Sequence, residues 1–142
     1  MSFLSLANLP NLKILLVDEN KMVMEPNSFH TSVPKFQLNV IKLTKCTTDH
    51  ELGLEPPKFH YYQYDSRYVD LSYCNFSGTV PLWLLEKTPK LEDLFLMGNS
   101  FTGFLLLPSV LNLKVSVIDI SDNKLQGQIP FNCSTFGTVI LI

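Results

Sequence analysis

A recurring pattern of apolar residues that ends in asparagine or cysteine constrains the fold of this chain more than any other feature. The segment LEDLFLMGNSFTG (91–103) aligns with VSVIDISDNKLQG (115–127), and Asn99 falls in the position of Asn123. Three earlier segments fit the same frame, at 66–78, 38–46 and 12–20. The last residue of the core pattern, here called the anchor, is in turn Asn20, Cys46, Cys74, Asn99 and Asn123. The chain is therefore predicted to consist of similar units that follow one another at 24 to 28 residues.

The apolar positions of this pattern are filled consistently. Three positions in each unit, eight, five and three residues before the anchor, should be buried, and fourteen of these fifteen are apolar, with Ser66 as the exception. Because 46% of the residues are hydrophobic, such agreement would arise by chance roughly once in several thousand trials. The pattern and its spacing are typical of leucine-rich repeats, in which each repeat buries its apolar face against its neighbours.

Each residue type in the repeat has a physical reason. The alternation in Val-Asp-Leu (69–71) and Ile-Asp-Ile (118–120) predicts short strands with one buried and one exposed face. The chain must turn after each strand while it is still buried, so the anchor asparagines are expected to pair with backbone groups there. Cys46 and Cys74 are expected to fill the same inward position as small thiols; a reactive or metal-binding role is the alternative.

These features predict an α/β solenoid, a right-handed leucine-rich-repeat superhelix or horseshoe arc. Short parallel strands are expected on its concave face, and loops or short helices on its convex face. The repeats should cover residues 1–130, and residues 131–142 are expected to form an irregular, truncated tail without a sixth strand. Pro81 should open a short outer helix. No capping element is recognisable at either end, so the repeats are expected to be part of a longer protein.

The segment 47–65 departs from the repeat and is expected to form a convex connector. Its aromatic residues are expected to pack beneath this connector, and a binding patch is the alternative. They are Phe59, Tyr61, Tyr62 and Tyr64.

Composition and motifs exclude several classes of function. The 11 basic and 13 acidic residues are scattered without blocks, which argues against a nucleic-acid or anionic-membrane partner. No apolar stretch approaches the roughly 18 residues that span a bilayer, and the start MSFLSLANLPNLK does not have the pattern of a signal peptide. The chain has no nucleophile elbow, phosphate-binding loop or zinc motif, and its three histidines are spaced unlike metal ligands. No enzyme activity, cofactor or metal site is expected.

Two segments, VSVIDISDNKLQGQIP and YVDLSYCNFSGTVP, resemble the plant-specific leucine-rich repeat L-x-x-L-x-L-x-x-N-x-L-x-G-x-I-P. The stretch 68–103 is most similar to the repeats of plant receptor-like proteins, and the resemblance extends over residues 6–130. It implies part of an ectodomain that recognises an extracellular peptide or protein in signalling or defence. It also implies a co-receptor kinase as partner and a place on the outer side of the plasma membrane. A fragment of a receptor kinase without its kinase domain and a secreted polygalacturonase-inhibitor-like protein remain alternatives.

The concave face predicts where a ligand would bind, because solenoids commonly bind partners there. The candidate ligand-facing residues are Tyr68, Asp70, Tyr73, Asp93, Phe95, Met97 and Asp119. The four apolar members should form a patch flanked by Asp70 and Asp93. The alternative is that these side chains only face solvent and bind no ligand. For the three aspartates, a solvent-exposed position is the expectation. Candidate N-glycosylation sites are Asn75, which should be exposed because it follows an anchor, and Asn132.

Overall fold

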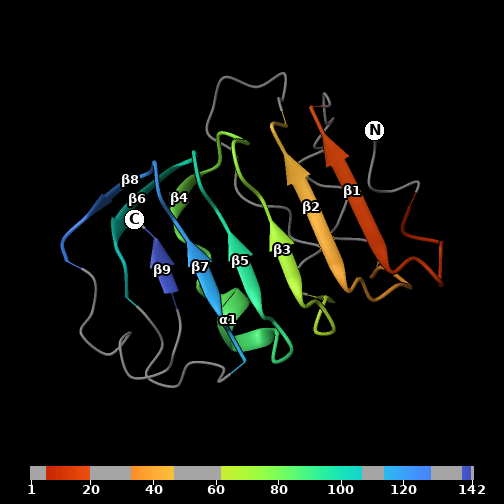
Figure 1. The fold of residues 1–142 in the computed structure, drawn as a ribbon. Helices are drawn as coiled ribbons and strands as arrows, with labels where there is room; N and C mark the ends of the chain where they lie inside the picture. Colours follow the sequence, from red (N-terminus) through yellow and green to blue (C-terminus); the bar gives the residue numbers. More distant parts are fainter. Residues whose placement is uncertain (1–5, 20–32, 47–61, 107–113, 129–138, 142) are drawn as a thin grey trace.

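The described part of the chain is a solenoid with one parallel strand per repeat (Figure 1). The computed structural model describes residues 6–19, 33–46, 62–106, 114–128 and 139–141; Asn20, Phe59, Tyr61 and Asn132 lie outside them. Six strands form the main sheet, in the order β1 (Ile14–Asp18), β2 (Val40–Thr44), β3 (Tyr68–Asp70), β5 (Asp93–Phe95), β7 (Val117–Asp119) and β9 (Val139–Leu141). The leucine-rich-repeat fold class is confirmed.

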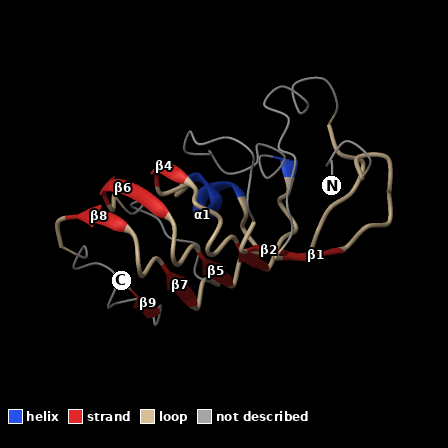
Figure 2. Cartoon of the chain, turned by 90° about the horizontal axis from the view of Figure 1, so that it is seen from above, coloured by secondary structure: helices blue, strands red, loops and turns tan. Residues whose placement is uncertain are grey.

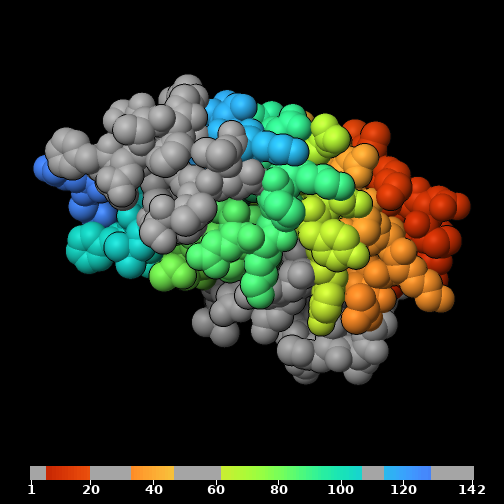
Figure 3. Space-filling view, turned by 90° about the horizontal axis from the view of Figure 1, so that it is seen from below, coloured from red at the N-terminus to blue at the C-terminus, as the bar shows by residue number. Residues whose placement is uncertain are grey.

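The strands pair in a register that keeps equivalent repeat positions side by side. Val40 pairs with Tyr68, Tyr68 with Asp93, and Asp93 with Val117. In each of these four repeats, the anchor lies six residues after the paired strand residue, from Cys46 after Val40 to Asn123 after Val117. The anchors therefore stack behind the ends of the strands, and the described repeats follow one another along the solenoid in sequence order (Figure 3).

The predicted inward positions form the core. The two strand residues that lie five and three positions before the anchor are buried in every described repeat: Leu15, Val17, Ile41, Leu43, Val69, Leu71, Leu94, Leu96, Ile118 and Ile120. Ser66, the one polar residue in the pattern, is also buried, and its Oγ donates to the carbonyl oxygen of Leu38 at 2.8 Å. This hydrogen bond explains why a hydroxyl is tolerated where the other repeats carry an apolar side chain.

A second sheet lies apart from the main one (Figure 2) and was not predicted. It contains β4 (Ser77–Thr79), β6 (Ser100–Phe104) and β8 (Lys124–Gln126), all parallel. Glycines four residues past the anchors have φ between 85° and 88°, a backbone region that favours glycine, and they recur at Gly78, Gly103 and Gly127. The short outer helix expected after Pro81 is present as α1 (Trp83–Lys87), which buries Leu84 and Leu85. No helix in the described ranges is long and apolar enough to span a membrane.

The tail 131–142, in which no sixth strand-and-anchor pattern was recognised, ends in a short strand. Val139–Leu141 forms β9, which pairs in parallel with β7 through Ile118 and Ile140. The segment has no apolar-polar alternation, because Val-Ile-Leu is a continuous apolar run. In this register, the anchor equivalent to Asn123 would fall beyond Ile142, so the residue type that identified the other repeats is missing.

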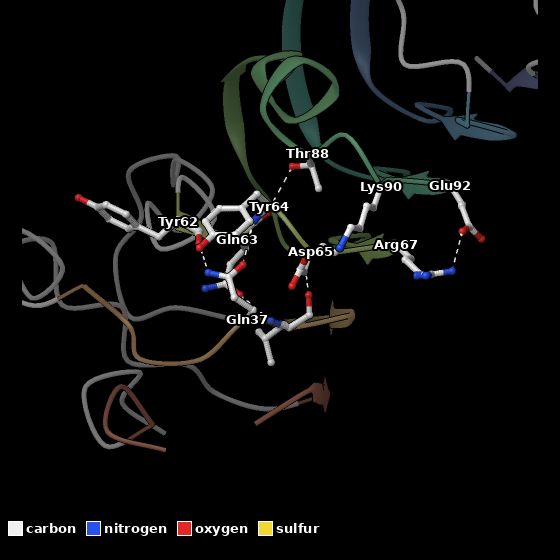
Figure 4. A network of polar contacts seen from close by, with 11 residues as sticks. Gln37, Tyr62, Gln63, Tyr64, Asp65, Arg67, Thr88, Lys90 and Glu92 are labelled. Carbon is white, nitrogen blue, oxygen red and sulfur yellow. Dashed lines mark hydrogen bonds and ion pairs between the residues drawn. The ribbon is translucent and has the colours of Figure 1, made fainter. Parts of the chain in front are cut away.

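The connector before β3 contains a buried glutamine between two exposed tyrosines (Figure 4). The Oε1 of Gln63 accepts from the backbone N–H of Leu38 at 2.7 Å, and its Nε2 donates to the carbonyl oxygen of Phe36 at 3.1 Å. The expectation that Tyr62 and Tyr64 pack beneath the connector is wrong. Here the side-chain amide of Gln63, between them, points inward and takes the place of backbone pairing between two repeats.

Candidate functional site

Two of the three aromatic residues predicted for the concave face are in contact on the solvent-facing side of the main sheet. Tyr68 and Phe95 lie on neighbouring strands, β3 and β5, and their ring centroids are 5.4 Å apart with an interplanar angle of 41°. This distance lies within the range of favourable aromatic pairs. Both residues are half-buried, so each ring keeps part of its surface available.

Tyr73 and Met97 follow the same two strands. The backbone N–H of Tyr73 donates to the carbonyl oxygen of Met97 at 2.8 Å, which links the two repeats at this level. Tyr73 is 46% exposed, whereas Met97 is half-buried. We call Tyr68, Tyr73, Phe95 and Met97 the strand-face patch.

Gly98 makes room for the ring of Tyr73. A Cβ atom at Gly98 would lie 2.2 Å from Cδ1 of Tyr73, so no larger residue fits without moving the ring. The φ of Gly98 is 67°, and the residues before the other anchors are also left-handed. This role of Gly98 was not predicted. The sequence contained one sign of this role: a glycine precedes the anchor Asn99, whereas the residues before the other anchors are Glu19, Lys45, Tyr73 and Asp122.

Two of the three predicted aspartates are largely buried. Asp70 and Asp119 are 8% and 7% exposed, and the Oδ1 of each accepts a backbone N–H two residues later, from Ser72 at 3.1 Å and Ser121 at 3.0 Å. These contacts are Asx turns that end the strands. The solvated face expected for the aspartates is therefore wrong for these two, whose carboxylates are covered and hydrogen-bonded in the turn at the strand end. Asp93, beside Tyr68 in the register, is half-buried.

The electrostatic surroundings keep Tyr68 as a neutral phenol. Burial, followed by the negative charges of Asp70 and Asp93, raises its pKa above the usual value of a tyrosine. A protonated phenol can donate one hydrogen bond as well as accept. The patch can thus offer apolar ring surface together with a polar group, the combination that protein interfaces favour.

Other features lie away from the patch. A pocket of about 270 Å³ is lined by residues of the repeat anchored at Asn123 and by Leu105 of the preceding repeat, and it shares none with the strand-face patch. No group of three or more potential metal ligands occurs in the described ranges. The candidate glycosylation site Asn75 is exposed as expected, and its Oδ1 accepts from the Oγ of Ser100 at 3.3 Å.

A family model matches one repeat of the chain, and known proteins align with most of its length. Residues 67–86 match the family described as Leucine Rich Repeat. Receptor-like protein 14 of Arabidopsis thaliana is 39% identical over 127 residues, which is 89% of this chain and 12% of that protein. Cuscuta receptor 1 of Solanum lycopersicum is 33% identical over 134 residues, 94% of this chain and 12% of that protein. Receptor-like protein 13 of Arabidopsis thaliana is 43% identical over 120 residues, 84% of this chain and 10% of that protein. The chain spans about an eighth of the length of such relatives.

Proposed function

Because the chain is a leucine-rich-repeat solenoid related to plant receptor-like proteins, we propose that it contributes to ligand recognition by such a receptor. The strand-face patch would contact an extracellular protein or peptide. The observation that carries this proposal is the contact between Tyr68 and Phe95 on the outer face of the main sheet. Partly exposed aromatic side chains are over-represented among the residues that dominate binding energy at interfaces.

The chemistry of the patch supports binding rather than catalysis. Tyr68 and Phe95 supply ring surface that is already ordered by their mutual contact, and Gly98 holds the ring of Tyr73 close to the backbone. A surface that is ordered before binding loses little conformational entropy when a partner arrives. The strand face of a solenoid is also the surface with which repeat proteins commonly bind.

The wider setting belongs to the same proposal. We place the protein on the outer side of the plasma membrane, in signalling or defence, with a co-receptor kinase as second partner. The relatives that are named as receptors support this setting. The exposed side chain of Asn75, the first residue of a sequon, also supports it, since N-glycosylation occurs on surface segments of secreted proteins. Asn75 is the proposed attachment site.

The test compares two pairs of substitutions in a full-length receptor that contains this chain. Tyr73→Ala with Phe95→Ala removes two rings of the patch, and the control Ile14→Ala with Leu16→Ala removes exposed apolar surface at the far end of the same face. Cells that express each receptor are challenged with fractionated extracellular fluid, and both ligand retention and signalling are measured. The patch pair should lose at least tenfold in apparent affinity, as expected for interface hot spots.

The control pair should change the affinity less than about twofold. Surface expression and thermal unfolding of the ectodomain show whether the variants fold. If the patch variant folds and still binds and signals like the parent, the proposed binding surface is incorrect.

A further inference from the structure

The anchors of two neighbouring repeats are both buried cysteines. Cys46 lies six residues after Val40, and Cys74 lies six residues after Tyr68, which is the strand partner of Val40. Cys46 is 5% exposed and Cys74 is 1% exposed. The two side chains thus occupy the same inward position in adjacent repeats, one stacked on the other.

The thiol of Cys74 reaches into the repeat that carries Cys46. The Sγ of Cys74 donates to the carbonyl oxygen of Leu43 at 2.9 Å, and the Sγ of Cys46 donates to the carbonyl oxygen of Thr44 at 3.7 Å. Leu43 and Thr44 are consecutive residues of one repeat, whereas Cys46 and Cys74 belong to two different repeats. In addition, a hydrogen bond with Cys46, together with burial, raises the pKa of the Cys74 thiol.

This arrangement satisfies the backbone requirement of a disulfide. Neighbouring strands lie about 4.8 Å apart, and disulfides join residues whose Cα atoms are about 4.4 to 6.8 Å apart. The two repeats stay paired close to the cysteines, because Lys42 is in register with Asp70 and the backbone N–H of Lys45 donates to the carbonyl oxygen of Ser72 at 3.1 Å. We propose that Cys46 and Cys74 form a disulfide that crosslinks the second and third repeats under oxidising conditions.

The exchange needs a small disulfide such as oxidised glutathione as oxidant. The thiolate of one cysteine attacks a glutathione sulfur, which breaks the glutathione S–S bond and releases one reduced glutathione. The second cysteine then attacks the protein sulfur of the mixed disulfide and releases the second glutathione. The two protein thiols are oxidised, one glutathione disulfide is reduced, and their protons pass to the two glutathione thiolates. Since both sulfurs are buried in the folded chain, the exchange takes place before the two repeats close.

The crosslink would strengthen this junction between repeats. It closes a loop from residue 46 to residue 74 and restricts the unfolded chain, which is the main stabilising effect attributed to disulfides. The thiol hydrogen bond from Cys74 to Leu43 is lost on oxidation, and the restriction of the unfolded chain offsets this loss.

Peptide mapping without reduction tests the pairing. The full chain is refolded in a buffer of reduced and oxidised glutathione, its free thiols are alkylated, and the monomer is digested for mass spectrometry. Cys46, Cys74 and Cys133 allow three pairings, and we expect the Cys46–Cys74 peptide to dominate while Cys133 is alkylated. The same oxidant in concentrated urea should give a mixture of all three. Recovery of Cys46 and Cys74 as alkylated thiols, or an identical mixture in both buffers, would overturn the proposal.

A second measurement uses variants without Cys133, so that neither Cys46 nor Cys74 can pair with it. Oxidation of a Cys133→Ser variant should raise its Tm by roughly 5 to 10 °C relative to the reduced form. A variant that also carries Cys46→Ser and Cys74→Ser should show no such difference. An equal Tm for the oxidised and reduced Cys133→Ser variant would count against a stabilising crosslink, even if the pairing is found.

Discussion

The junctions between repeats are built in two ways, one with an asparagine anchor and one with a cysteine anchor. The Oδ1 of Asn99 accepts from the backbone N–H groups of Cys74 and Phe76, and its Nδ2 donates to the carbonyl oxygens of Leu71 and Leu96. Cys74 only donates, to the carbonyl oxygens of Leu43 and Ser72. Both anchors point inward and reach the previous repeat, but only the amide can also accept strong hydrogen bonds.

The difference affects the segment that follows each strand. Asn99 holds the N–H of Phe76 directly before β4, and Asn123 holds the N–H of Phe101 within β6. In the described part of the chain, β4 and β6 are thus both tied at or near their starts by the asparagine of the next repeat. A thiol at the anchor fills the space and satisfies a carbonyl, but it does not fix the backbone N–H groups of its neighbour.

The largest effect should come from removing the amide of Asn99. Asn99→Ala deletes five hydrogen bonds and leaves buried backbone groups without partners, so the free energy of unfolding should fall by about 3 kcal/mol. Urea unfolding of the full chain measures the change. Asn123→Ala is the matched control and should cost less, because Asn123 is only partly buried and makes four such bonds. If Asn99→Ala costs no more than a surface substitution, the anchor is not what holds the repeats together.

The repeat architecture could be predicted from the sequence because its signal is periodic. Apolar strand positions and anchor types recur in five segments, and this was sufficient for the fold class and for placing Tyr68 and Phe95 on adjacent strands. The second sheet could not be predicted from strand patterns. Ser-Gly-Thr (77–79) and Lys-Leu-Gln (124–126) have little strand character, and both segments are strands because they pair with β6 of the neighbouring repeat.

The details of the candidate site depend on contacts that a linear pattern does not contain. The low exposure of Asp70 and Asp119 goes with Asx turns to Ser72 and Ser121, which the D-x-S spacing allows but does not distinguish from exposure. The burial of Gln63 likewise depends on two backbone groups from the preceding repeat. Side-chain hydrogen bonds, within one repeat for the two aspartates and between repeats for Gln63, therefore account for these differences between expectation and structure.

A smaller effect should follow from converting the cysteine junction into an asparagine junction. Cys74→Asn introduces an Oδ1 that can accept the N–H of Cys46, as Asn99 accepts the N–H of Cys74, while the Nδ2 keeps the contact with Leu43. Under reducing conditions the free energy of unfolding should rise by about 1 kcal/mol. Cys74→Ala, which removes the donor without adding an acceptor, should lower it by a similar amount. A Cys74→Asn variant that is no more stable than Cys74→Ala would mean that the two kinds of junction do not differ in hydrogen bonding.

The smallest effect concerns alkaline pH, to which only the cysteine junction should respond. The hydrogen bond with Cys46 and burial raise the folded pKa of Cys74, whereas the thiol of an unfolded chain ionises near about 8.5. A raised folded pKa gives stability that is complete below the unfolded pKa and is lost as the pH rises above it. The same hydrogen bond lowers the pKa of Cys46, which acts in the opposite direction, so Cys46 is replaced by Ala in both chains that are compared. Between pH 8 and 9, the reduced Cys46→Ala chain, in which burial still raises the pKa of Cys74, should lose about 0.5 kcal/mol more than the variant with Cys46→Ala and Cys74→Ala. This window lies below the range in which tyrosines ionise, so Tyr68 does not contribute. Urea unfolding of both chains at the two pH values measures the difference, and parallel losses would show that the Cys74 thiol is not protected by the junction.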